Sequence, residues 1–170
     1  RVVCSPQLTP EDIEALRQGY REKGLSLALD RDLGEMADEP VAEAATRLLA
    51  TMVSQRVLDI RVAFRPAECG IFHDKVGIFT DQAGDRVSFS GSANETWAAW
   101  SGRGNFEGFH THRSWVETDH VHQDVEYFER LWANHETGLE VVPFPEVTRE
   151  RLIAKAHPDG VEAAQEELER

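Results

Sequence analysis

The sequence predicts a mixed α/β fold, and three observations lead to that expectation. The 170 residues, 41% hydrophobic and 29% charged, suffice for one domain with a core and are too balanced for wholesale disorder. Stretches with helical spacing of apolar residues and stretches with strand-like alternation follow one another along the chain. No run of about eighteen apolar residues occurs, which excludes a membrane-spanning helix on composition.

The first third of the chain predicts one strand and two helices. Residues 1–5 are typical of a buried strand entered partway, so we expect a fragment of a longer protein. A helix is expected from Thr9 to Gly24, because a hydroxyl, a proline and two acids stand at its start and a glycine at its end. Residues 26–39 are acidic and are expected to be irregular. A second helix is expected over residues 40–55.

The rest of the chain alternates between strands and helices. Alternation over residues 58–65 predicts a half-exposed strand. Residues 71–80 and 86–90 are expected to pair as a hairpin through a turn at residues 81–85. The further expected elements are a short helix or turn at 93–102, a strand at 106–115, an amphipathic helix at 121–135, a short strand at 139–142 and two polar helices from Val147 onward.

Charge and cysteine content limit the possible partners and surroundings. The formal net charge is −13, although residues 56–114 carry seven cationic and seven acidic side chains. This excess of acid predicts weak nonspecific binding to a phosphate backbone, while local fields still permit a phosphodiester substrate. Cys4 and Cys69 are too few for a disulfide framework. We expect both thiols to be reduced and the protein to be cytoplasmic.

The residues with the clearest chemical potential lie around the predicted hairpin. On a strand His73 and Lys75 point to the same face, and Gly77 leaves room beside them. After the hairpin come Ser92 and Asn94, whose side chains and backbone N–H groups are suited to surround an oxyanion. An imidazole, a fixed cation and neutral donors together suit phosphoryl transfer without a metal.

These residues resemble the signature of the phospholipase D superfamily. The matching positions are His73-x-Lys75, then Gly91-Ser92-x-Asn94, then Glu107 at the start of a following strand. Val3 to Ile13 is also similar to phospholipase-D-like nuclease modules at the N-terminus of bacterial DEAD/DEAH-type helicases. The resemblance covers residues 1–145 and implies an α/β phospholipase-D-like mixed β-sheet flanked by helices, lacking its N-terminal start. Residues 146–170 would then be a helical linker or tail toward a further domain.

The resemblance also implies a mechanism and partners. His73 would attack phosphorus to give a phosphohistidine, Lys75, Asn94 and Ser92 would hold the nonbridging oxygens, and Glu107 would fix the His73 tautomer. No metal or other cofactor is expected. The family's active site needs two histidines, so a homodimer or a second His-x-Lys motif elsewhere in a longer chain is implied. The expected partners are DNA and a helicase domain, with no membrane.

One departure from the family pattern concerns an acidic residue. The family places an aspartate five positions after the lysine, whereas this chain has Thr80 there and Asp81 one position later. In the family that aspartate is mainly a structural partner, so the shift affects the expected strand geometry more than the expected chemistry.

Other interpretations remain open at the level of sequence. The same fold without turnover would be a DNA-binding or dimerisation module, and a lipid phosphodiesterase is disfavoured by the acidic charge. Cys69 is more typical of a structural thiol than of a nucleophile. Tryptophans 97, 100 and 115 suit packing better than base stacking. A zinc hydrolase would use the histidines at 110, 112, 120 and 122 with Asp119 or Asp124.

Overall fold

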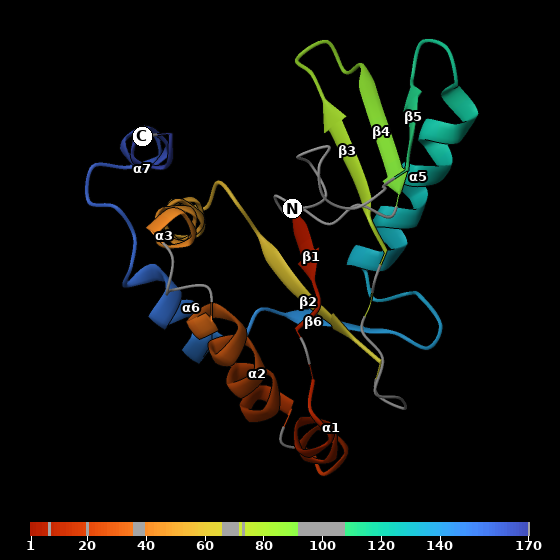
Figure 1. The fold of residues 1–170 in the computed structure, drawn as a ribbon. Coiled ribbons are helices and arrows are strands. Elements are labelled where there is room, and N and C mark those ends of the chain that lie inside the picture. The colour runs from red at the N-terminus through yellow and green to blue at the C-terminus, as the bar shows by residue number, and fades with distance from the viewer. Residues whose placement is uncertain are drawn as a thin grey trace. The chain divides into compact units, whose positions relative to one another are not determined.

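The computed structural model describes residues 1–6, 8–19, 21–35, 40–65, 72, 74–91 and 108–169. Over these residues the fold is mixed α/β, with six helices and two three-stranded sheets (Figure 1). The chain divides into unit 1, residues 1–72 with 137–170, and unit 2, residues 73–136. Among the described helices none has the length and apolar character needed to cross a membrane.

Unit 1 contains a sheet with strand order β1-β2-β6, formed by Val2–Cys4, Ile60–Phe64 and Glu140–Pro143. The pairing of β1 with β2 is parallel and that of β2 with β6 is antiparallel. The expectation of a half-exposed β2 is wrong, because four of its five residues are buried. A strand between two neighbours is more enclosed than an edge strand. The alternating pattern of residues 58–65 came from Asp59, Arg61 and Arg65, of which only Arg61 lies in β2. A long cationic side chain can reach solvent from a mostly buried strand.

Helices cover one face of this sheet. They are α1 (Pro10–Arg17), α2 (Arg21–Glu35), α3 (Pro40–Ser54) and α6 (Glu146–Ile153), while α7 (Val161–Leu168) packs on α3. Apolar side chains of α1 and α2 surround Val62 and Phe64, and those of α3 and α6 surround Ile60. Leu152 and Ala164 are buried. The two terminal helices expected from the sequence are therefore present, and each has buried residues on the side that packs on α3.

Helix α1 begins where the sequence predicts, but it ends earlier than predicted. Thr9 and Asp12 form a reciprocal capping box at the predicted start. The helix ends at Arg17, before Gly19 with its positive φ of 87°, and α2 then runs through the stretch expected to be irregular. Gly24 lies inside α2, where an added Cβ would stand 3.4 Å from the Asp12 carbonyl oxygen. This glycine therefore lies within a helix, where it contacts α1, and does not end a helix.

Asp12 links this helix pair electrostatically as well. Its carboxylate accepts hydrogen bonds from the Thr9 N–H at 2.8 Å and from the Arg31 guanidinium at 3.0 Å. Burial alone would raise the pKa of Asp12, but the Thr9 N–H, the Arg31 guanidinium and the Thr9 hydroxyl together hold it below the usual aspartate value. The carboxylate is thus kept charged between α1 and α2.

Unit 2 is an antiparallel sheet with strand order β3-β4-β5 and one helix. Its elements are β3 (Val76–Thr80), β4 (Arg86–Gly91), β5 (Phe109–Arg113) and α5 (Thr118–Trp132). Figure 1 shows α5 lying along this sheet, with which it makes contacts at all three strands. Strand β3 begins five residues later than the sequence predicted, because its partner β4 ends opposite Lys75. The helix or turn expected at 93–102 lies outside the described residues.

Candidate active site

Three strand ends meet at one end of the unit 2 sheet. The Gly91 N–H donates to the Lys75 carbonyl oxygen at 3.1 Å, and Gly91 is in register with Phe109 on the next strand. The segments that carry the two motif halves and the downstream acid therefore leave the sheet at this end. Of the predicted site residues the structure describes Lys75, while His73, Ser92, Asn94 and Glu107 lie outside the described residues.

Lys75 lies two residues before a glycine that an aromatic ring covers. Its side chain is half-buried, and none of the described residues makes an ion pair with its ammonium. Two residues further on, Gly77 pairs with Phe89, whose ring covers it so closely that a Cβ would stand 2.1 Å from the ring. Phe89 in turn stacks on the exposed Phe79 at 5.9 Å between ring centroids. The room predicted beside the His-x-Lys motif at Gly77 is thus filled by an aromatic ring.

The middle residue of the His-x-Lys motif is tied to α5. The Tyr127 hydroxyl donates to the Asp74 carboxylate at 2.5 Å. Burial, and after it the Asp74 carboxylate, raises the pKa of Tyr127 well above the usual tyrosine value. The phenol therefore stays protonated and remains a donor at neutral pH. This bond ties Asp74, which directly precedes Lys75, to α5.

A second bond joins α5 to the central strand. The fully buried Ser88 hydroxyl donates to the Asp124 carboxylate in a short hydrogen bond. Ser88 pairs with Ile78 across the hairpin, so the helix is held to both strands. Sequence reasoning missed the positioning roles of these residues and of Asp74. The one available signal was periodicity, because Asp124 and Tyr127 are three apart and so share a face of α5.

Asp81, the aspartate that stands six positions after Lys75, has a structural role. The Asp81 carboxylate accepts from the N–H groups of Ala83 at 2.8 Å and Asp85 at 2.9 Å. The Gly84 N–H also donates to the Asp81 carbonyl, and Gly84 has a φ of 88°. Asp81 therefore organises the β3–β4 turn, which is an Asx-type arrangement. The predicted hairpin turn is confirmed.

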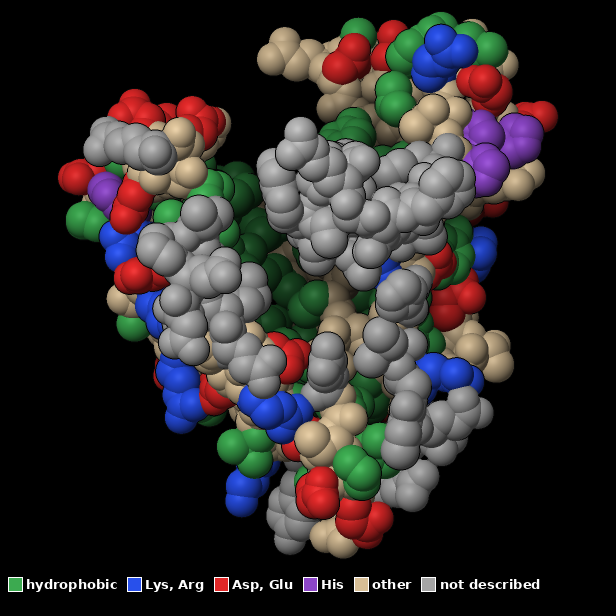
Figure 2. Space-filling model, in the orientation of Figure 1, with side chains coloured by type: hydrophobic (Ala, Val, Ile, Leu, Met, Phe, Trp, Pro, Cys, Tyr) green, Lys and Arg blue, Asp and Glu red, His purple; other side chains and the backbone are tan. Residues whose placement is uncertain are grey.

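The histidines that suggested zinc form other contacts. Histidine side chains gather on the surface over β5 and the start of α5 (Figure 2). The rings of His112 and His120 stack at 4.6 Å between centroids. The Nε2 atom of His122 lies 3.3 Å from the Oε1 atom of Glu126. Within the described part of the chain, no group of three or more His, Cys, Asp or Glu side chains is arranged to hold a metal ion.

The remaining candidates contribute little to this site as described. Cys4 donates weakly to the Arg61 carbonyl at 3.6 Å, and burial raises the pKa of its thiol to about 11. Cys4 therefore has the character of an unreactive thiol. Trp115 is exposed, and Cys69 and tryptophans 97 and 100 lie outside the described residues.

Comparison with known proteins identifies no relative. No family model, curated protein or solved structure matches the chain. The described part of the site contains the half-buried Lys75 side chain at the open end of the β3–β4 hairpin. It also contains Asp74, which is hydrogen-bonded to Tyr127 of α5. A cation held at a strand end is suited to bind an anionic oxygen.

Proposed function

We propose that this chain is a metal-independent phosphodiesterase that acts on DNA through a phosphohistidine, as the nuclease part of a helicase-type or defence protein. The observation that carries the proposal is the hydrogen bond from the Gly91 N–H to the Lys75 carbonyl, at 3.1 Å. It holds the His-x-Lys segment and the root of the Gly-Ser-x-Asn segment side by side. In phospholipase-D-like enzymes these two segments bind one phosphate.

The chemistry proceeds in two displacement steps. An imidazole nitrogen of His73 forms a bond to phosphorus as the bond to the leaving oxygen breaks, and a second histidine gives its proton to that oxygen. The same second histidine then takes a proton from water, which attacks phosphorus and breaks the P–N bond, returning His73. Lys75 and Asn94 neutralise the nonbridging oxygens, with Ser92 as a further donor. A second copy of the chain, or a further motif, supplies the second histidine.

A second candidate function is a phospholipase-D-like module that binds DNA or pairs with another copy without turnover. It is favoured by the single His-x-Lys motif in these 170 residues. The charge of −13 gives no advantage to either candidate, because it weakens nonspecific DNA binding in both.

The test is cleavage of labelled single- and double-stranded DNA in EDTA, together with the mass in solution. His73→Ala and Lys75→Ala should each lower the rate by roughly 10²–10⁴-fold, the usual contribution of such groups. The matched control is His135→Ala, which removes an exposed imidazole just after α5 and should leave the rate unchanged. DNA binding by a folded dimer without cleavage would favour the inactive module, and cleavage retained in His73→Ala would refute the proposal.

A further inference from the structure

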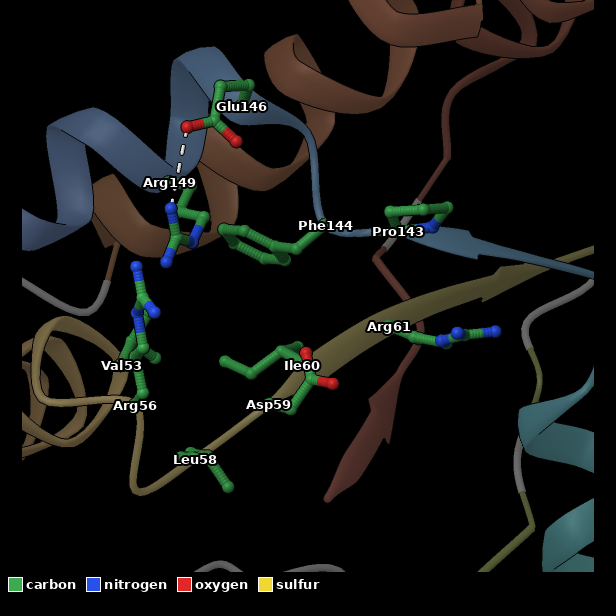
Figure 3. Close-up of a pocket in the computed structure, with 10 residues that line it drawn as sticks. All are labelled: Val53, Arg56, Leu58, Asp59, Ile60, Arg61, Pro143, Phe144, Glu146 and Arg149. Carbon is green, nitrogen blue, oxygen red and sulfur yellow. Dashed lines mark hydrogen bonds and ion pairs between the residues drawn. The ribbon is translucent and has the colours of Figure 1, made fainter.

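Unit 1 contains a cavity of about 510 Å³. None of the candidate active-site residues described above lines it. It lies between the end of α3, the start of β2 and the first turn of α6 (Figure 3). The apolar lining comes from the side chains of Val53, Leu58, Ile60, Pro143 and Phe144. A cavity of this size falls within the usual range for small-molecule sites, about 300–1,000 Å³.

Two arginines face each other at this cavity. Figure 3 shows the guanidinium groups of Arg56 and Arg149 pointing toward one another, with the Phe144 ring beside them. Arg149 has a weak contact with the Glu146 carboxylate at 3.4 Å. Within the described residues Arg56 has no acidic partner. Asp59 and Arg61 also line the cavity, so three cationic and two acidic side chains surround it. The two facing guanidinium groups make the region between them locally cationic and suited to bind an anion.

The backbone of Arg56 adds an independent observation. Three described helices, α1, α3 and α5, have a left-handed residue two positions after their last helical residue: Gly19 at φ 87°, Arg56 at 59° and Asn134 at 60°. Glycine and asparagine are the residues that favour this position, whereas a long side chain there costs roughly 1 kcal/mol. The chain thus places an arginine at a position where glycine would be more stable. Strained residues of this kind cluster at ligand clamps.

We infer that this cavity binds a nucleoside monophosphate, either free or as the 5′ end of a nucleic-acid strand. The phosphate lies between Arg56 and Arg149, where two guanidinium groups donate charge-assisted hydrogen bonds. The planar base packs on Phe144 and on the apolar floor formed by Val53 and Ile60. The inference does not depend on the proposed function, because all of these residues lie in unit 1 and take no part in the His73–Lys75 chemistry.

The test measures binding of AMP by calorimetry, with adenosine and inorganic phosphate as its separate halves. Arg56→Gly and Arg149→Gln should each weaken AMP binding by about tenfold or more, the usual effect of losing one charged hydrogen bond. Glu146→Gln should strengthen it, since the carboxylate competes for Arg149. Lys155→Ala is the matched control, because it removes an exposed cation of unit 1 that does not line the cavity.

The Arg56→Gly variant also distinguishes a role of Arg56 in ligand binding from a role in the stability of the fold. Its melting temperature should equal or exceed that of the wild type while its affinity falls, a combination that a merely structural arginine would not give. A 5′-phosphorylated oligonucleotide that binds more tightly than both AMP and its 5′-hydroxyl counterpart identifies the strand end as the ligand. Tighter binding of AMP than of the phosphorylated oligonucleotide identifies the free nucleotide as the ligand. Absence of AMP binding by the wild type, or equal affinity in Arg56→Gly and Lys155→Ala, would overturn the inference.

Discussion

The hydrogen bond between Tyr127 and Asp74 makes a quantitative prediction about unit 2. Tyr127→Phe removes the hydroxyl and keeps the ring, and Asp74→Ala removes the carboxylate that accepts the bond. A hydrogen bond to a charged group contributes about 1.5–3 kcal/mol. Because Asp74 is exposed and its charge is partly screened by solvent, we expect a coupling free energy of about 1 kcal/mol in a double-mutant cycle.

The tryptophans provide a selective assay for this cycle. All four, at positions 97, 100, 115 and 132, belong to unit 2. Urea unfolding followed by tryptophan fluorescence therefore reports on the unit that contains the bond. The matched control pairs Tyr127→Phe with Asp119→Asn, an exposed acid in the first turn of α5 more than two helical turns away. That control cycle should be additive within about 0.5 kcal/mol.

The pH dependence follows from the same bond. The folded-state pKa of Tyr127 is raised, so its contribution to stability is fully present below the ordinary tyrosine pKa of about 10 and is lost as the pH rises beyond it. Tyr127→Phe should remove this alkaline loss. A coupling free energy below about 0.3 kcal/mol, or the same alkaline loss in the variant, would refute the view that Asp74 is held by Tyr127.

Three further predictions concern other parts of the fold. Gly77→Ala should destabilise unit 2 by about 1–3 kcal/mol in the urea assay, because its methyl group would overlap the Phe89 ring. In a Cys69→Ser background the Cys4 thiol should resist alkylation at pH 8 until the protein unfolds, since burial raises its pKa to about 11. Asp12→Asn should remove a loss of stability that the wild type shows below about pH 4, because the lowered pKa of Asp12 contributes stability only while the carboxylate is charged.

Each of these three has a contradicting result. Gly108→Ala is the control for the glycine, as an added Cβ there meets no atom within 4 Å. Equal effects of the two glycine variants would argue against packing of the ring on Gly77. Rapid alkylation of native protein would contradict a buried Cys4. Identical acid unfolding of Asp12→Asn and wild type would show that Asp12 is not held charged by its neighbours.

Local signals in the sequence predicted most of the elements, and long-range packing decided the rest. Turn chemistry around Asp81 and the apolar spacing of α3 and α5 each belong to a few neighbouring residues, so both were predictable. The continuation of α2 through Gly24 accompanies the packing of α2 on α1, and the burial of β2 depends on strands that are distant in sequence. Neither effect can be predicted from a stretch of ten neighbouring residues in the sequence.

The candidate sites show the same division. Motif spacing indicated Lys75, because a short signature stands within one hairpin. The bonds that fix its segment join residues 53 and 36 positions apart, Asp74 with Tyr127 and Ser88 with Asp124. The Arg56–Arg149 pair spans an even longer separation and depends on a backbone conformation. Such pairs become visible only once the chain is folded.

The central claim is a covalent phosphohistidine, and its most direct measurement is intact-protein mass after rapid mixing with DNA in EDTA. We predict a nucleotide adduct on the wild type that peptide mapping places at His73, that is labile to acid, and that is absent from His73→Ala and present in His135→Ala. DNA cleavage that proceeds without any adduct, or an adduct retained by His73→Ala, would contradict the claim.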